Sequence, residues 1–237
     1  MEIHTGIQIR DLVLFIPLEK TVIFSDFHMG YEEAILKGGV LLPRHQLPDT
    51  LTRVKKILEG ITVETIIVTG DLKHEFGTIS GSEWKQSFAL LDLFAQYASK
   101  VLLIKGNHDS VLGPIARKKN VEIVPYVLLN DIFICHGDVI PNNLDFEKAK
   151  TLIIGHEHPA ITLHDTTKKE HYKCFLKGAY KKKTLLVLPS FNLVTTGTNI
   201  LKEHLLSPFL QQDLKHFTVY IVEKDRIYNF GKIKDLM

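Results

Sequence analysis

The chain has 237 residues, of which 45% are hydrophobic and 24% are charged, and its formal net charge is +2. This composition is typical of a globular protein and excludes disordered, collagen-like and coiled-coil chains. A charge so close to balance neither requires nor excludes an anionic partner.

The cysteine content and the N-terminus bear on the compartment. Two cysteines, Cys135 and Cys174, are too few for a disulfide framework or a thiolate metal cluster, so we expect a cytoplasmic protein. The most apolar early run, residues 12–18, is far shorter than the roughly 20 residues that cross a bilayer, and no signal-peptide pattern precedes it. We therefore expect no membrane association. Because no repeat or long linker divides the chain, we expect one domain over residues 1–237.

Five short apolar runs in the first part of the chain are typical of buried strands. They cover residues 21–25, 65–69, 101–105, 131–135 and 151–154. The stretches 45–59 and 82–99 have helical spacing, and the second is expected to face a core with Trp84, Phe88, Leu91 and Ala95. Strands that alternate with helices indicate an α/β fold.

The pattern changes after the last of these strands. Strand-like segments follow at 160–164, 172–177, 183–188 and 217–223, and a closing hairpin is expected through Asp225 and Arg226. Residues 160–237 are therefore expected to add antiparallel strands to a second sheet. Two sheets packed face to face with helices outside would accommodate both halves of the chain.

Each of the five early runs is followed at once by residues that can bind a metal ion. The motifs are Asp26-Phe27-His28, Gly70-Asp71-Leu72-Lys73-His74, Gly106-Asn107-His108-Asp109, His136-Gly137-Asp138 and Gly155-His156-Glu157-His158. Ligands gather beyond the carboxyl ends of strands in α/β sheets, so we expect the five motifs to meet in one crevice. Singly, each motif is also explained by a turn or a hydrogen-bonded core histidine. Their common position and order favour a shared site.

The residue types indicate a metal centre of intermediate hardness. Carboxylate, imidazole and amide donors without thiolate suit Mn²⁺, Fe²⁺ or Zn²⁺. Asp26 and His28 are two residues apart, so both side chains can face one site from extended backbone. Asp71 has two carboxylate oxygens that can bridge two metal cations. Two cations bridged in this way polarise a phosphoryl group and hold a hydroxide for in-line attack.

The ordered motifs between Asp26 and His158 resemble the signature of the calcineurin-like metallophosphoesterases, in particular the SbcD-related branch of repair nucleases and smaller phosphoesterases. The resemblance implies a four-layer α-β-β-α sandwich of two mixed sheets flanked by helices. It also implies two divalent cations, with Mn²⁺ expected and Fe²⁺ or Zn²⁺ as alternatives. One cation would be held by Asp26, His28, Asp71 and His158, and the other by Asp71, Asn107, His136 and His156.

The same resemblance assigns three catalytic positions. His108 would lie near the leaving oxygen as a general acid or transition-state stabiliser, with Asp109 orienting its ring. His74 would lie near the scissile phosphate, or else serve as a supporting or turn histidine. The chain departs from the repair nucleases at Lys73, where they often carry an aromatic residue. We also expect no separate DNA-binding cap like theirs, and therefore do not expect processing of duplex ends with an ATPase partner.

A lysine-rich segment follows the last motif. Residues 168–183 contain seven lysines and one acidic residue, with Tyr172, Phe175 and Tyr180 interleaved. Such a segment can guide a phosphate backbone and offer rings for base stacking. A solvated hairpin, with lysines protecting an edge strand, explains it equally simply.

These observations give three hypotheses for function. The first is a metal-dependent phosphodiesterase with two cations that acts as a nuclease on single-stranded or end-containing nucleic acid. The second is an enzyme with the same ligands and a narrower pocket that hydrolyses a small phosphodiester or phosphomonoester, such as a cyclic nucleotide. The third is a metal-binding scaffold without turnover.

Overall fold

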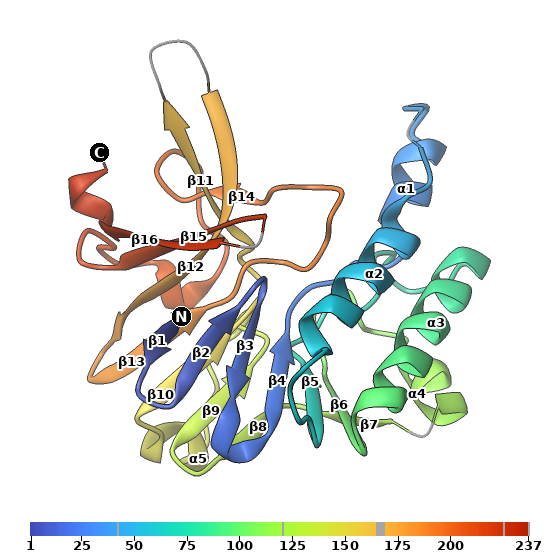
Figure 1. Cartoon of the computed structure of the whole chain (residues 1–237), viewed down its shortest axis with the longest axis horizontal. Coiled ribbons are helices and arrows are strands. Elements are labelled where there is room, and N and C mark those ends of the chain that lie inside the picture. Colours follow the sequence, from blue (N-terminus) through green and yellow to red (C-terminus); the bar gives the residue numbers. More distant parts are fainter. Residues whose placement is uncertain (42, 120, 165–168, 225, 237) are drawn as a thin grey trace.

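Two mixed β-sheets pack face to face in the computed structural model, which describes residues 1–41, 43–119, 121–164, 169–224 and 226–236 (Figure 1). The first sheet has the strand order β1-β2-β3-β4-β5-β6-β7. The second has the order β14-β11-β12-β13-β10-β9-β8, with β15 paired to β12 and β16 paired to β15. Helices flank the sheets, so the α/β sandwich expected from the sequence is confirmed.

The elements of the first sheet come from the N-terminal half of the chain. Its strands are β1 (Glu2–His4), β2 (Ile7–Arg10), β3 (Val13–Ile16), β4 (Thr21–Phe24), β5 (Thr65–Val68), β6 (Lys100–Ile104) and β7 (Glu122–Val124). The helices beside it are α1 (Tyr31–Lys37), α2 (Gln46–Leu58), α3 (Gly81–Tyr97) and α4 (Gly113–Lys119) (Figure 1).

The second sheet is built from the remainder of the chain. Its strands are β8 (Val127–Leu129), β9 (Ile132–Cys135), β10 (Thr151–Ile154), β11 (Pro159–His164), β12 (Lys169–Tyr180), β13 (Lys183–Val187), β14 (Thr198–Asn199), β15 (Thr218–Glu223) and β16 (Arg226–Lys232). Helix α5 (Leu144–Lys148) and short 3₁₀ turns cover its outer face, where Phe146 and Phe209 are buried.

Parallel pairing in both sheets determines where the site lies. Strands β4, β5, β6 and β7 are parallel neighbours, as are β9, β10 and β13. β4 and β10 are buried along their whole length, as are all but the first residues of β5, β6 and β9. The segments that follow these strands therefore leave the sandwich at one edge.

One hydrophobic cluster joins the two sheets. Ile23 and Ile67 of the first sheet belong to the same buried cluster as Ile153 and Leu186 of the second. This shared core supports the prediction of one domain. Among the described residues, no helix has both the length and the apolar character needed to cross a membrane.

The predicted elements are largely confirmed, with one correction to a helix face. The five early strands lie within one residue of the predicted limits, and the antiparallel pairing of β15 with β16 confirms the closing hairpin, although Asp225 lies outside the described residues. In α3, Leu91 is buried in the core and Trp84 and Phe88 pack against it, as predicted, whereas Ala95 is exposed. The outer faces of the Trp84 and Phe88 rings are covered by Lys118 and Lys119 of α4.

The structure divides the lysine-rich segment into exposed and inward-facing lysines. β12 pairs with β11 over residues 169–173, with β15 over residues 174–177 and with β13 over residues 176–180, so only its middle has partners on both sides. Lys173 donates to Ser190 Oγ at 2.8 Å, Lys177 to the carbonyl of Ile3 at 2.6 Å, and Lys183 to the carbonyl of Glu147 at 2.6 Å. Phe175 is fully buried, and Lys168 lies outside the described residues. Lys173, Lys177 and Lys183 therefore support the sandwich, whereas Lys169, Lys181 and Lys182 are exposed, as a solvated hairpin requires. That the segment guides a phosphate backbone stays a prediction.

Candidate metal centre

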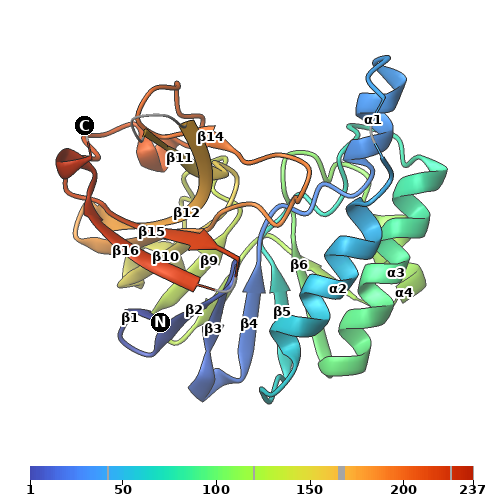
Figure 2. The same cartoon turned by 45° about the horizontal axis from the view of Figure 1, so that its top comes forward.

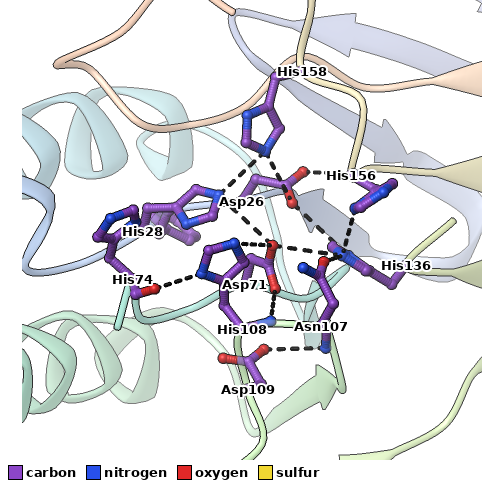
Figure 3. Close-up of polar contacts among 12 residues, drawn as sticks. Asp26, His28, Asp71, His74, Asn107, His108, Asp109, His136, His156 and His158 are labelled. Atoms are coloured by element: carbon purple, nitrogen blue, oxygen red, sulfur yellow. Dashed lines mark hydrogen bonds and ion pairs between the residues drawn. The ribbon is translucent and has the colours of Figure 1, made fainter. Parts of the chain in front are cut away.

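The segments after β4, β5, β6, β9 and β10 meet at one edge of the sandwich (Figures 2 and 3). The backbone N–H of His28 donates to the carbonyl of Asp71 at 2.9 Å, which ties the first motif to the second. The backbone N–H of His156 donates to Asp26 Oδ2 at 3.0 Å, which ties the two sheets together. All ten predicted site residues lie in this cluster (Figure 3).

Asp26, His28 and His158 form one group of ligand atoms that lie within 4.8 Å of one another. His158 Nε2 lies 3.3 Å from Asp26 Oδ1 and 3.3 Å from His28 Nε2. Asp26 Oδ1 is buried and has no hydrogen-bond partner. A buried carboxylate oxygen that faces two ring nitrogens fits a bound cation, which would satisfy all three atoms.

Asp71, His136 and His156 form a second group with the same spread. His136 Nδ1 donates to the carbonyl of Thr69 at 2.8 Å, so its Nε2 presents a lone pair when the ring is neutral. That Nε2 lies 2.9 Å from Asn107 Oδ1 and 3.2 Å from His156 Nδ1. A histidine held by a backbone carbonyl with its other nitrogen toward further donors is the usual arrangement of a metal ligand.

Asp71 lies between the two groups. Its Oδ2 is 3.7 Å from His28 Nε2 of the first group and 3.5 Å from His136 Nε2 of the second (Figure 3). A Cβ atom at Gly106 would overlap Asp71 Oδ1, so the close approach of the third motif to this carboxylate requires glycine. This position suits a carboxylate that bridges two cations.

Burial shifts the pKa of several of these groups. It raises the pKa of Asp71 to about 8, against the opposing influence of His136. It lowers the pKa of His28 well below the usual value, and lowers that of His156 to about 4. For Asp26, burial is outweighed by His158, His136 and His28, so its pKa falls below the usual range. The rings of His28 and His156 are therefore neutral at pH 7 and can donate lone pairs to a cation.

His108 and Asp109 have separate hydrogen-bond partners. His108 Nδ1 donates to the carbonyl of His74 at 2.5 Å, and Nε2 lies 4.0 Å from Asp71 Oδ2. Asp109 Oδ2 accepts from the backbone N–H groups of Leu72 at 3.4 Å and Gly106 at 3.2 Å, while its Oδ1 has no partner. The carboxylate thus holds the turns beneath the site. The His108 ring is bonded to the carbonyl of His74, and the orienting role predicted for Asp109 has no support in these hydrogen bonds.

His74 lies beside His108, at the side of the centre away from His156 (Figure 3). The two rings stack with centroids 5.5 Å apart, and Tyr31 packs edge-on against His74 at 4.5 Å. His28, His74 and His108 form a third group of nearby ring nitrogens. Burial lowers the pKa of both His74 and His108. The prediction that His74 contacts substrate stays a prediction.

Comparison with known families identifies the chain. The family model described as calcineurin-like phosphoesterase matches residues 19–197, which include every motif of the site. The chain belongs to the calcineurin-like phosphoesterase family. It is a metal-dependent phosphoesterase, and its described residues contain the His and Asp groups needed to hold divalent metal ions.

Comparison with solved structures finds similar chains at low sequence identity. A nuclease named MPE from Pseudomonas putida is 20% identical with a TM-score of 0.66, and the match covers 93% of this chain and 92% of that one. Yfce, a phosphoesterase from E. coli, is 14% identical with a TM-score of 0.43, covering 92% and 94% of the two chains. No curated protein matches the sequence.

The sequence analysis missed two residues that hold the phosphoesterase's histidines in place. Glu83 caps α3 and also accepts the backbone N–H groups of His74 at 3.1 Å and Glu75 at 2.7 Å. Lys73 is fully buried, and its Nζ donates to the carbonyls of Glu75 and His108. The pair Ser80 and Glu83 is a capping-box pattern that could have revealed Glu83 from the sequence. Nothing in the sequence marks Lys73 as buried.

The loop after β13 crosses from the second sheet toward the first (Figures 1 and 2). The backbone N–H groups of Phe191 and Asn192 donate to the carbonyls of Ser25 at 2.7 Å and Asp26 at 3.1 Å. This loop therefore holds the backbone of the first motif in place.

Five predicted ligands have left-handed backbone conformations. Asp26, His28, Asp71, His156 and His158 have φ between 47° and 67°, a region that costs most L-residues energy. Such strain is found at functional sites where the surrounding structure imposes it. We therefore expect that the metal-free protein stores strain at these positions.

This strain predicts an unusual order of stability at His156. In the presence of a chelator, we expect His156→Gly to be more stable than His156→Ala by about 1 kcal/mol, because glycine adopts positive φ freely. Urea unfolding measures the difference. His136, whose φ is not positive, provides the matched control, and there the Ala variant should be the more stable of the two. The same order at both positions would contradict backbone strain at His156.

Proposed function

We propose that this phosphoesterase is a phosphodiesterase that uses two divalent cations to cleave single-stranded or end-containing nucleic acid. The observation that carries the proposal is the position of Asp71 Oδ2 between the two ligand groups, with His108 Nε2 4.0 Å away on the open side. The first cation would be held by Asp26, His28, Asp71 and His158, and the second by Asp71, Asn107, His136 and His156. When bound, the cations would polarise the phosphoryl group and activate water.

The residues of the chain would orient the substrate and handle its proton. In its imidazolium form, His108 would donate Nδ1–H to the carbonyl of His74 and is placed to give the Nε2 proton to the leaving oxygen, which leaves the ring neutral. His74 is stacked beside it and can contact a non-bridging phosphate oxygen. The nitrogen and oxygen donors support Mn²⁺ as the metal, with Fe²⁺ and Zn²⁺ as alternatives. Two buried free thiols, Cys135 and Cys174, support a cytoplasmic location.

An exposed aromatic ring beside His108 favours nucleic acid over a small phosphoester. The Phe76 side chain is 61% exposed, and its ring centroid lies 3.8 Å from that of His108. Exposed aromatic rings in single-strand-binding sites serve as platforms for bases. A base next to the scissile phosphate can therefore stack on Phe76 at the rim of the centre.

The experiment that tests this function compares substrate classes. Metal-free protein is reconstituted with Mn²⁺, Zn²⁺ or Mg²⁺ and given labelled single-stranded DNA, RNA, a cyclic nucleotide and an aryl phosphomonoester. We expect cleavage of a nucleic acid strand with Mn²⁺ and none after chelation. Turnover confined to the cyclic nucleotide or the monoester would favour a small-molecule enzyme, and no turnover by fully metallated protein would favour a binding scaffold.

Phe76 provides a second test. Removing its ring in Phe76→Ala should lower kcat/KM for single-stranded DNA about tenfold, in line with the roughly 1–3 kcal/mol of one stacked base. Hydrolysis of methyl p-nitrophenyl phosphate, which has no base, should change little. Phe76→Trp keeps a stacking surface and should retain DNA cleavage. An equal loss on both substrates would instead make Phe76 a packing partner of His108.

A further inference from the structure

A cavity of about 610 Å³ opens directly beside the predicted second cation position. Asn107 and His136, two predicted ligands of the second cation, line this cavity. A chemical group bound in the cavity would therefore lie next to a phosphate bound at the metal centre. Its volume falls within the range of roughly 300–1,000 Å³ found for sites that enclose a small organic molecule. A cavity of similar size, about 620 Å³, lies among α1, α2 and α3, but none of the ten predicted site residues lines it.

The outer walls of this cavity are mostly apolar. Val124 and Pro125 line one side at the end of β7, and Val139 and Pro141 line the other, in the segment after the His136 motif. The Val139 side chain is 63% exposed. When a flat or apolar group of the substrate covers this exposed apolar surface, the surface is removed from water, and this burial contributes favourable binding free energy.

The charges in the cavity are balanced. Lys105 and Asp138 both line it, so it carries one cationic and one anionic side chain. Because the two charges oppose each other, the cavity offers no net attraction to a second phosphate group, which favours a neutral occupant over the sugar–phosphate backbone. Ser110 adds a hydroxyl that can donate or accept. Apolar walls with a few polar groups that can both donate and accept suit a heterocyclic base.

We propose that this cavity binds the nucleobase of the nucleotide whose phosphate lies at the metal centre. The proposal rests on the proposed phosphodiesterase function and specifies its substrate as a nucleotide unit. Phe76 lies against His108, whereas this cavity lies against Asn107 and His136, so the two features contact different parts of a bound strand.

Binding of two small ligands tests the base pocket. Calorimetry on the Mn²⁺-loaded protein compares deoxyadenosine 5′-monophosphate with 2-deoxyribose 5-phosphate, which lacks only the base. We expect the nucleotide to bind at least tenfold more tightly. Val139→Glu, which places a charge on the apolar wall, should remove that difference and leave the affinity for the sugar phosphate unchanged. The matched control is Leu144→Glu, an exposed apolar residue outside the cavity, which should leave both affinities unchanged.

Three results would contradict the proposed base pocket. The first is equal affinity of the wild type for the nucleotide and the sugar phosphate, and the second is that neither ligand binds. The third is that Val139→Glu weakens the binding of both ligands equally. Failure of the proposed function would appear separately. A protein that binds the nucleotide through its base but cleaves no phosphodiester would keep the pocket and lose the proposed phosphodiesterase function.

Discussion

The Asp71→Asn variant is expected to lose about a thousandfold or more of its turnover on an aryl phosphodiester with Mn²⁺. Asp71 Oδ2 lies between His28 and His136 of the two ligand groups, so the loss of its charge affects both cation positions. The asparagine amide has the same shape as the carboxylate. Its Oδ1 can still accept the hydrogen bond from the backbone N–H of His108, which is 2.9 Å long in the wild type. The fold should therefore be retained.

Metal content and a surface variant distinguish this effect from unfolding. We expect the bound Mn²⁺ to fall below two ions per chain, measured by elemental analysis after gel filtration, while circular dichroism is unchanged. Asp92→Asn is the control, because Asp92 is an exposed aspartate that pairs with Lys119 on the surface. Wild-type turnover and wild-type metal content in Asp71→Asn would rule out a two-cation mechanism.

The His108→Asn variant is expected to keep its metal and lose about 10²–10⁴-fold in turnover on a substrate with a poor leaving group. His108 lies outside both predicted ligand sets, and its Nδ1 is engaged by the carbonyl of His74. If His108 protonates the leaving oxygen, an alkyl ester needs it far more than a p-nitrophenyl ester, whose leaving group departs without a proton. The ratio of the two rates therefore measures its role.

Two controls complete this experiment. His204→Asn replaces an exposed histidine outside the site and should leave both rates unchanged. Elemental analysis should find the same Mn²⁺ content in His108→Asn as in the wild type. Equal losses for both leaving groups would indicate that His108 stabilises charge in the transition state without donating a proton, and loss of metal would make it a ligand.

The sequence predicted the site well because its residues follow strongly apolar strands. β4 and β10 are continuous runs of buried residues, so their ends could be located. They belong to different sheets, and the packing of the two sheets face to face brings Asp26 and His156 together. The N-terminal strands β1, β2 and β3 were missed. Each has only three or four residues, and their antiparallel turns carry no motif.

The errors concern side chains whose partners are distant in sequence. The lysines of β12 were interpreted as a surface feature, but Lys177 reaches a carbonyl 174 positions away at Ile3. Asp109 was assigned to the ring of its neighbour His108, yet the backbone N–H groups of Leu72 and Gly106 take its Oδ2. Local spacing predicts which residues enter the cluster, whereas the pairing of hydrogen-bond groups inside it depends on the complete fold.

The left-handed backbone conformation of the predicted metal ligands also limits which substitutions could change the preferred metal of this enzyme. Asn, Asp and Gly tolerate positive φ, whereas Val, Ile and Thr, with branched Cβ atoms, do not. A library that exchanges His28 or His158 to select a different metal should therefore return mainly short polar or glycine substitutions, whatever the chemistry selected. Changes of specificity would then arise more readily in the walls around the centre than among the predicted metal ligands.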